Sequence, residues 1–120
     1  MQQRLTEETS IYLQISRMIE TDILRGILLE EERVPSTNEL AKLYTINPAT
    51  AAKGVNLLVD EGILYKKRGI GMFVSTGAAE KIRSRRKQEF YEVRLAELLA
   101  EAKSLGITQQ ELIEQIGKRG

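Results

Sequence analysis

The sequence predicts a mainly α-helical protein with a small β-hairpin. Several segments place apolar residues three or four positions apart, which is the spacing of helices with one buried face. Two short runs rich in apolar residues, 63–66 and 72–75, flank a loop with two glycines, which indicates a hairpin. No apolar run reaches the roughly 20 residues that a bilayer-spanning helix needs.

The first helix is expected to begin near Thr9 or Ser10, because both residue types are good N-caps, and to end at Gly26. Residues 28–33 hold two leucines followed by three glutamates, which is a poor strand pattern, so a loop closed by Pro35 is expected there. One apolar stripe at helical spacing runs along the first helix and consists of Ile11, Ile15, Met18, Ile19 and Ile23.

Capping signals predict two further helices joined by a tight turn. Ser36 and Glu39 form a capping box, in which each side chain bonds to the backbone amide of the other residue. After a turn at residues 45–46, Asn47 is an N-cap and Pro48 takes the first helical position, where no amide hydrogen is missed.

The third helix is expected to run from Pro48 to about Asp60 and to stop at Glu61-Gly62. Its outward face is expected to carry small and polar side chains, and its inward face apolar ones. The predicted inward residues are Leu40, Ala41, Leu43 and Tyr44 in the second helix, and Ala51, Val55, Leu58 and Val59 in the third.

The C-terminal half is expected to contain the hairpin and two more helices. Residues 67–71 should join the two strands as a basic loop. Residues 77–79 are expected to be a short hinge before a long helix over about 79–104. A second capping box, Thr108 with Glu111, then opens a last short helix.

Charge is segregated along the chain although the net charge is only +1. Residues 42–94 carry 11 Lys+Arg against 5 Asp+Glu, whereas residues 1–41 carry 4 against 8 and residues 95–120 carry 3 against 4. A basic middle is what local contact with phosphates requires, since only the contacting face needs a positive potential. Chance clustering of solvated charge is the alternative.

The composition argues against catalysis and metal binding. The chain contains no cysteine and no histidine, so it has no disulfides, no thiolate metal ligands and none of the commonest general base. Carboxylate groups such as 30–32 and 60–61 indicate a solvated face. We therefore expect no enzyme activity, no metal and no cofactor. Residues 1–8 contain no apolar signal core, which favours a cytoplasmic protein without a membrane partner.

Two capped helices at a tight turn, followed by a basic hairpin, describe a winged helix-turn-helix, whose second helix enters the major groove of DNA. Small residues at the start of that helix let it sit deep, and Lys53 can reach a guanine edge or a phosphate. A plain helical hairpin with a solvated tip is the alternative. The expected DNA-binding residues are Ser36, Thr37, Asn38, Asn47, Pro48, Ala49, Thr50, Lys53, Lys67, Arg68, Gly69 and Gly71.

The last two helices carry an apolar stripe that so short a segment cannot bury within itself. It needs either the N-terminal domain or a partner chain, and we favour a homodimer, because such readers usually bind two half-sites with two-fold symmetry. The expected dimerisation residues are Tyr91, Leu95, Leu98, Leu99, Ala102, Leu112, Ile113 and Ile116.

These motifs together resemble the GntR family of bacterial transcription regulators. The resemblance covers roughly residues 10–75 and rests on Ile11-Tyr12-Leu13-Gln14-Ile15, Pro35-Ser36, Leu40-Ala41, Asp60-Glu61-Gly62-Ile63-Leu64 and Gly69-Ile70-Gly71-Met72-Phe73-Val74.

The resemblance implies a DNA-binding domain at residues 1–76 and a two-helix dimerisation tail at 77–120, as in the short YtrA-like branch of the family. Members of that branch often repress transporter operons, so the resemblance implies a dimeric repressor that binds a double-stranded operator. The family commonly has arginine where this chain has Asn38 and Pro48, so the operator should differ from those of arginine-bearing members.

Two other functions remain open on the sequence. The winged domain could serve as a helical protein-interaction module that does not bind DNA, although such a module need not retain a basic wing. A ligand-responsive switch would have to bind an unknown small-molecule effector at the dimer interface or between the tail and the winged domain. No residue cluster points to a particular ligand.

Overall fold

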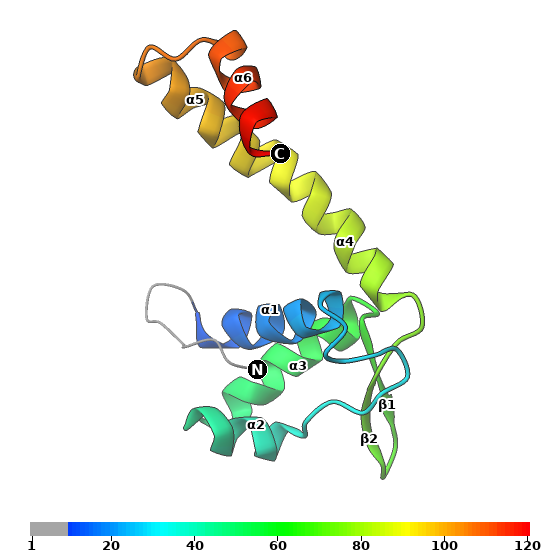
Figure 1. The fold of residues 1–120 in the computed structure, drawn as a ribbon. Helices are drawn as coiled ribbons and strands as arrows, with labels where there is room; N and C mark the ends of the chain where they lie inside the picture. Colours follow the sequence, from blue (N-terminus) through cyan, green and yellow to red (C-terminus); the bar gives the residue numbers. More distant parts are fainter. Residues whose placement is uncertain (1–9) are drawn as a thin grey trace. The chain divides into compact units, whose positions relative to one another are not determined.

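The computed structural model describes residues 10–120, so the proposed helix start at Thr9 lies outside the described residues. Residues through Arg83 form one compact unit, and Ser84–Gly120 form a second. The elements, drawn in Figure 1, are α1 (Ile11–Leu24), α2 (Thr37–Tyr44), α3 (Pro48–Asp60), β1 (Leu64–Lys67), β2 (Gly71–Val74), α4 (Ala78–Glu89), the π-helical segment η1 (Phe90–Leu95), α5 (Ala96–Ser104) and α6 (Gln109–Arg119).

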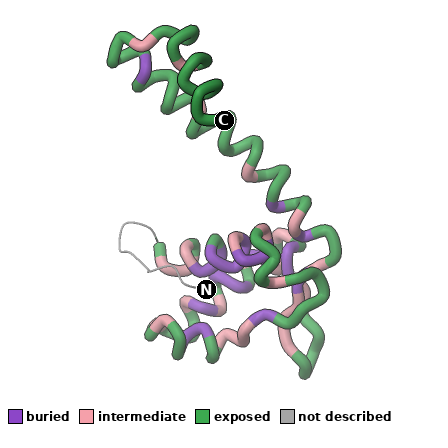
Figure 2. The backbone as a smooth tube through the Cα atoms, in the orientation of Figure 1, coloured by how far each residue is buried: buried purple, intermediate pink, exposed green. Residues whose placement is uncertain are grey.

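The core of the first unit lies where α1 and α2 pack on α3, with the hairpin closing one end (Figures 1 and 2). The predicted stripe on α1 is confirmed for four of its residues, which are buried, while Ile11 is partly buried against the core. The largest fully buried side chains are Ile15, Ile19, Leu40, Leu58, Ile63, Leu64, Ile82, Val34, Val55 and Val74.

Helices α1 and α3 approach closely at Gly54. A Cβ atom on Gly54 would lie 2.7 Å from the backbone oxygen of Tyr12 and 3.1 Å from the Cβ atom of Ile15. The buried Ser16 hydroxyl donates a hydrogen bond of 2.5 Å to the Gly54 carbonyl. Only a residue without a side chain allows this backbone-to-backbone approach, which fixes how α3 crosses α1.

The turn between α2 and α3 ends α2 with a left-handed residue. Thr45 is the C-cap of α2 and has φ 53° and ψ 53°. Its amide bonds to the carbonyls of Ala41 and Lys42, which satisfies the end of the helix in the way an αL cap does. The turn redirects the chain so that Asn47 can start α3 at once.

The prediction that Leu43 lies on the inner face of α2 is wrong, because this side chain is 61% exposed. Leu40 and Ala41 are buried and Tyr44 is half-buried, so the buried side of α2 is centred on those three positions. Leu43 lies roughly 100° around the helix from that centre, since successive residues are about 100° apart.

The hairpin is antiparallel, with Lys67 opposite Gly71 and Tyr65 opposite Phe73. The strands span 64–67 and 71–74, one residue away from the predicted ranges, so Lys67 and Gly71 belong to strands rather than to the loop.

Residues 31–34 do more than form the expected loop, because their backbone follows the free edge of β2. The Glu31 amide donates to the Val74 carbonyl at 2.7 Å, and the Val34 amide donates to the Met72 carbonyl at 3.0 Å. Arg33 is thereby paired with Phe73 in an antiparallel bridge. The chain that leads into α2 is therefore tied to the wing.

The stretch expected to be a hinge is already helical, since α4 begins at Ala78. Ala78 and Ile82 are 1% and 0% exposed and belong to the core of the first unit. The winged unit therefore extends past residue 76, because the first turns of α4 supply apolar side chains that complete its core.

The second unit continues the helix of α4 through η1 into α5, and then folds back as α6. The π-helical segment Phe90–Leu95 interrupts what was predicted as one regular helix. The predicted capping box at α6 is confirmed: Thr108 Oγ1 accepts from the Glu111 amide at 3.1 Å, and Glu111 Oε1 accepts from the Thr108 amide at 3.1 Å. Within residues 10–120, no helix has the length and apolarity required to cross a bilayer.

Candidate nucleic-acid interface

The exposed face of α3 presents its N-terminal residues to solvent. Pro48, Ala49 and Lys53 are exposed, whereas Thr50 is half-buried. The exposed N-cap Asn47 uses its side-chain oxygen to accept from the Ala49 amide at 2.8 Å. That bond fixes the start of the helix. It uses the side-chain oxygen of Asn47, so the side-chain NH2 group remains to donate to a ligand.

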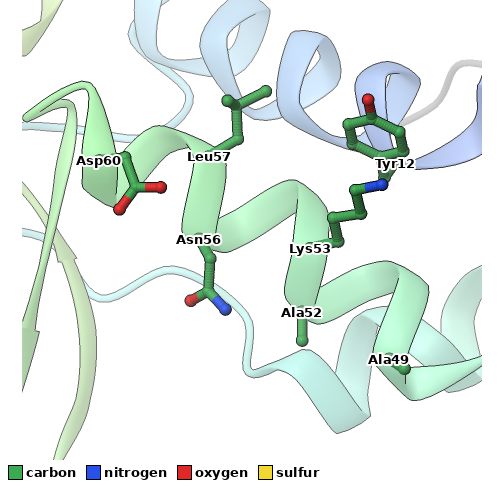
Figure 3. A pocket seen from close by; sticks show the side chains of 7 residues that line it. All are labelled: Tyr12, Ala49, Ala52, Lys53, Asn56, Leu57 and Asp60. Atoms are coloured by element: carbon green, nitrogen blue, oxygen red, sulfur yellow. The ribbon is translucent and has the colours of Figure 1, made fainter.

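The side chain of Lys53 extends from this face toward α1. Its ammonium lies over the ring of Tyr12 on α1, with Nζ 4.1 Å from the ring centroid (Figure 3). Asn56, one turn further along α3, points away from α1. Both belong to an open hollow on this side of α3, lined by Tyr12, Ala49, Ala52, Lys53, Asn56, Leu57 and Asp60. The ring thus fixes a cation at the α1 side of the exposed face.

The start of α2 has its hydrogen bonds satisfied internally. The Ser36 hydroxyl accepts from the Glu39 amide at 3.1 Å, and the Glu39 carboxylate accepts from the Ser36 amide at 3.2 Å, so the predicted capping box is confirmed. Both bonds lower the pKa of the Glu39 carboxyl, and the bond from the Ser36 backbone amide has the larger effect. Asn38 is exposed, whereas Ser36 and Thr37 are half-buried, so Asn38 is the most accessible of the three to a ligand.

The wing exposes its cations around a small aromatic cluster. Lys67, Arg68 and Gly69 are exposed. The Lys67 ammonium lies 4.3 Å from the ring centroid of Phe73, and this ring stacks on Tyr65 at 5.9 Å between centroids. The aromatic pair gives Lys67 a fixed platform, as cation–π contacts do.

The base of the wing is tied down by Glu31. Its carboxylate accepts hydrogen bonds from the hydroxyls of Tyr65 and of Thr76, the latter at 2.6 Å. The bond from Thr76, followed by that from Tyr65, lowers the pKa of the Glu31 carboxyl. The same contact with Glu31 raises the pKa of the Tyr65 hydroxyl. These bonds connect the segment before α2 to the start of β1, through Tyr65, and to the chain just after β2, through Thr76.

Arg33 is a cation at the wing that the sequence motifs did not predict. Its Nε lies close enough to Gly71 that a Cβ atom there would be 2.8 Å away. The signal in the sequence is weak, since a single arginine after three glutamates looks like part of a charged loop. Only the pairing of residues 31–34 with β2 brings it to the wing.

The expected dimerisation residues all lie in the second unit, and most are exposed there. Leu95 and Leu112 are half-buried, and Ala102 is 5% exposed within the single chain, so a partner could gain little from Ala102. The exposed members are Tyr91, Leu98, Leu99, Ile113 and Ile116.

Among residues 10–120, no group of three or more acidic side chains is placed to hold a metal ion. The first unit combines a helix of the recognition type behind a tight turn with a cationic hairpin beside it. This arrangement defines a winged helix-turn-helix.

The chain belongs to the gntR family of bacterial regulatory proteins, which it matches over residues 11–74. It is 32% identical to the HTH-type transcriptional repressor YtrA of Bacillus subtilis over 108 residues, a match that covers 90% of this chain and 82% of YtrA. It is 36% identical over 67 residues to the arabinose metabolism transcriptional repressor of Halalkalibacterium halodurans. That match covers 56% of this chain and only 18% of the repressor, so the chain spans a small part of some curated relatives.

Solved structures agree with this assignment. A GntR-family transcriptional regulator from Bacteroides thetaiotaomicron superposes with a TM-score of 0.78 at 36% identity, covering 90% of this chain and 95% of that one. The DNA-binding domain of AraR in complex with operator ORX1 matches with a TM-score of 0.54 at 32% identity, covering 62% of this chain and 92% of that domain. The predicted fold class and family are both confirmed.

Proposed function

We propose that this protein is a sequence-specific DNA-binding transcription regulator that acts as a dimeric repressor. The observation that carries the proposal is the fixed placement of the basic wing against the helix-turn-helix. At the end of α3 the Ile63 amide donates to the Leu58 carbonyl at 2.9 Å, so the connection from α3 to β1 is short and held by a hydrogen bond. On the other edge, residues 31–34 tie β2 to the segment that enters α2.

With this geometry, α3 enters the major groove and the wing lies along the neighbouring groove. Ala49 and Pro48 let the helix approach the base edges, and the amide of Asn47 donates to a base or a phosphate. Lys53, Lys67 and Arg68 neutralise phosphates, and the exposed Asn38 addresses an adenine edge or a phosphate. The positive ends of the α2 and α3 dipoles add to the attraction.

The family relationship supports the regulatory part of this proposal. YtrA and NagR of Bacillus subtilis are named as transcriptional repressors, and the AraR domain is bound to operator DNA. The resemblance to the short YtrA-like branch extends the proposal to a transporter operon as the regulated target, in the cytoplasm.

We further propose that the second unit forms the dimer. Leu98 is 49% exposed and Ile116 is 65% exposed, and both belong to the apolar stripe of α5 and α6. Large apolar side chains exposed together on a small helical hairpin mark an association surface. The expected partner is a second copy of the chain related by two-fold symmetry, because a protein that binds paired DNA half-sites usually has this symmetry.

The proposal is tested by selecting duplexes from a randomised DNA library with the full chain, followed by fluorescence anisotropy on the selected duplex. Lys53→Ala and Arg68→Ala should each weaken binding, and both should make it less dependent on salt, by a slope of about 0.9 for each phosphate that the variant no longer neutralises. Lys118→Ala, which removes an exposed cation near the end of α6, is the control and should leave binding unchanged. Failure to enrich any duplex would refute the function.

A further inference from the structure

Arg33 occupies a defined position on the wing rather than a free loop. It pairs with Phe73 across the edge of β2, opposite to the edge that β1 occupies. Residues directly opposite each other in an antiparallel ladder project their side chains to the same face. Arg33 therefore shares a face with Phe73, and so does Tyr65, which pairs with Phe73 from β1.

Gly71 belongs to this same face, because residues two positions apart on a strand point the same way. Lys67 is its partner on β1, so Lys67 stands on one side of Gly71. The guanidinium of Arg33 stands on the other side, where Nε and Cζ would lie 2.8 Å and 3.6 Å from a Cβ atom on Gly71. Two cations thus flank Gly71, the one glycine within the two strands.

Glycine suits this position for two reasons. Its φ of +148° is a conformation that residues with a side chain rarely adopt, and a Cβ atom there would lie 2.8 Å from Arg33 Nε, so the guanidinium would have to move aside. The absence of a side chain lets the Arg33 guanidinium approach the backbone of β2 closely.

Two carboxylates in the segments around Arg33 accept hydrogen bonds from other residues. The charge of Arg33 contributes to lowering the pKa of Glu39, which places the guanidinium within electrostatic range of the start of α2. The Glu39 carboxylate is held in its capping box, and the Glu31 carboxylate is held by Tyr65 and Thr76. Arg33 therefore lies between the wing and the start of α2, the two pieces that face DNA in the proposed function.

We propose that Arg33 and Lys67 form a phosphate-binding seat around Gly71, and that Arg33 is a DNA-backbone contact of this protein. The inference rests on the proposed function, since it assigns a further binding residue to the same interface. A guanidinium offers a planar fork of donors that matches phosphate oxygens. Such a contact fixes the position of the wing on the duplex without reading a base, because phosphates carry no sequence information.

The test compares Arg33→Ala with the wild-type protein on a duplex selected from a randomised library and on a scrambled duplex of equal length. Removal of a cation that binds phosphate should weaken binding to both duplexes by a similar factor. The slope of log K against log salt should become shallower by about 0.9 for each arginine removed. A fourfold dilution of salt should then strengthen wild-type binding by about 3.5-fold more, per arginine, than variant binding.

Matched variants separate this role from a structural one. Arg33→Lys should keep the salt slope, because the charge remains, while losing part of the affinity. Arg25→Ala removes an exposed arginine at the end of α1, outside the ladder, and should change neither quantity. Thermal unfolding of every variant shows whether the fold is retained.

Gly71→Ala provides a second route to the seat. The added methyl group should displace the guanidinium and weaken binding, and this effect should be smaller in an Arg33→Ala background than in the wild type. If wild-type protein selects a duplex while Arg33→Ala keeps its affinity and salt slope, the seat is refuted and the proposed function stands. If the wild-type protein selects none, the proposed function itself fails.

Discussion

The ammonium of Lys53 lies 4.1 Å from the centre of the Tyr12 ring, although the two residues come from different helices. The contact depends on the close crossing of α1 and α3, where the Tyr12 backbone oxygen faces Gly54. A lysine held in this way loses less side-chain freedom when it meets a phosphate. We therefore expect Tyr12 to position Lys53 for contact with DNA.

We expect Tyr12→Leu to weaken binding to a selected duplex by roughly two- to fivefold, since an exposed cation–π contact contributes about 0.5–1 kcal/mol. Tyr12→Phe should bind like the wild type, because the ring is kept. In a Lys53→Ala background Tyr12→Leu should have little further effect. Equal reductions in both backgrounds, measured by anisotropy, would show that Tyr12 acts independently of Lys53.

Gly54→Ala is expected to destabilise the fold by about 1–3 kcal/mol, because the new methyl group would overlap the Tyr12 carbonyl. This destabilisation should outweigh the gain of roughly 1 kcal/mol that alanine brings to a helix. Urea unfolding measures the change. Gly117→Ala is the control, since a Cβ atom at this helical glycine meets nothing within 4 Å. That variant should be as stable as the wild type or more so.

Thr45→Asn should stabilise the protein by about 0.5–1 kcal/mol. The exposed Thr45 has φ 53°, a left-handed conformation that disfavours a β-branched residue and that asparagine tolerates. Chemical denaturation should show a higher midpoint with an unchanged slope. Thr21→Asn, placed within the right-handed helix α1, should bring no such gain.

Stability should fall on acidification partly through Glu31 and Glu39. Hydrogen bonds lower the pKa of each below its ordinary value of 4.5. Such a group stabilises the folded state above that value, and the contribution disappears as the pH falls through the lowered pKa. The double variant Glu31→Gln, Glu39→Gln should therefore lose less stability between pH 7 and about pH 3 than the wild type in urea titrations. A wild-type-like acid dependence in the variant would contradict this cause.

The self-association of the second unit should depend on its exposed apolar side chains. Leu98→Glu combined with Ile116→Glu should shift sedimentation equilibrium toward the monomer, since two charges would be buried unpaired in the interface. Gln110→Glu, an exposed polar position on the same unit, is the control for added charge. A double variant that remains dimeric would place the interface elsewhere.

The sequence predicts local features because the residues that form them lie within one helical turn of each other. The caps at Ser36, Asn47 and Thr108 form bonds to residues two or three positions away, so spacing alone predicts them. The hairpin was placed to within one residue for the same reason. The exposure of Leu43 was missed because it depends on which side of α2 meets α3.

The amino-acid sequence by itself thus determined the helices, the tight turn, the basic hairpin and the family. Tertiary structure alone decided that Arg33 lies beside Gly71, that Tyr12 lies beneath Lys53, and that Ile82 belongs to the winged core. Each of these joins residues distant along the chain, and their approach is set by the shared packing of several elements rather than by local bonds. The place of Arg33 on the wing is therefore a product of the fold as a whole, whereas Lys67 and Arg68 follow from the hairpin itself.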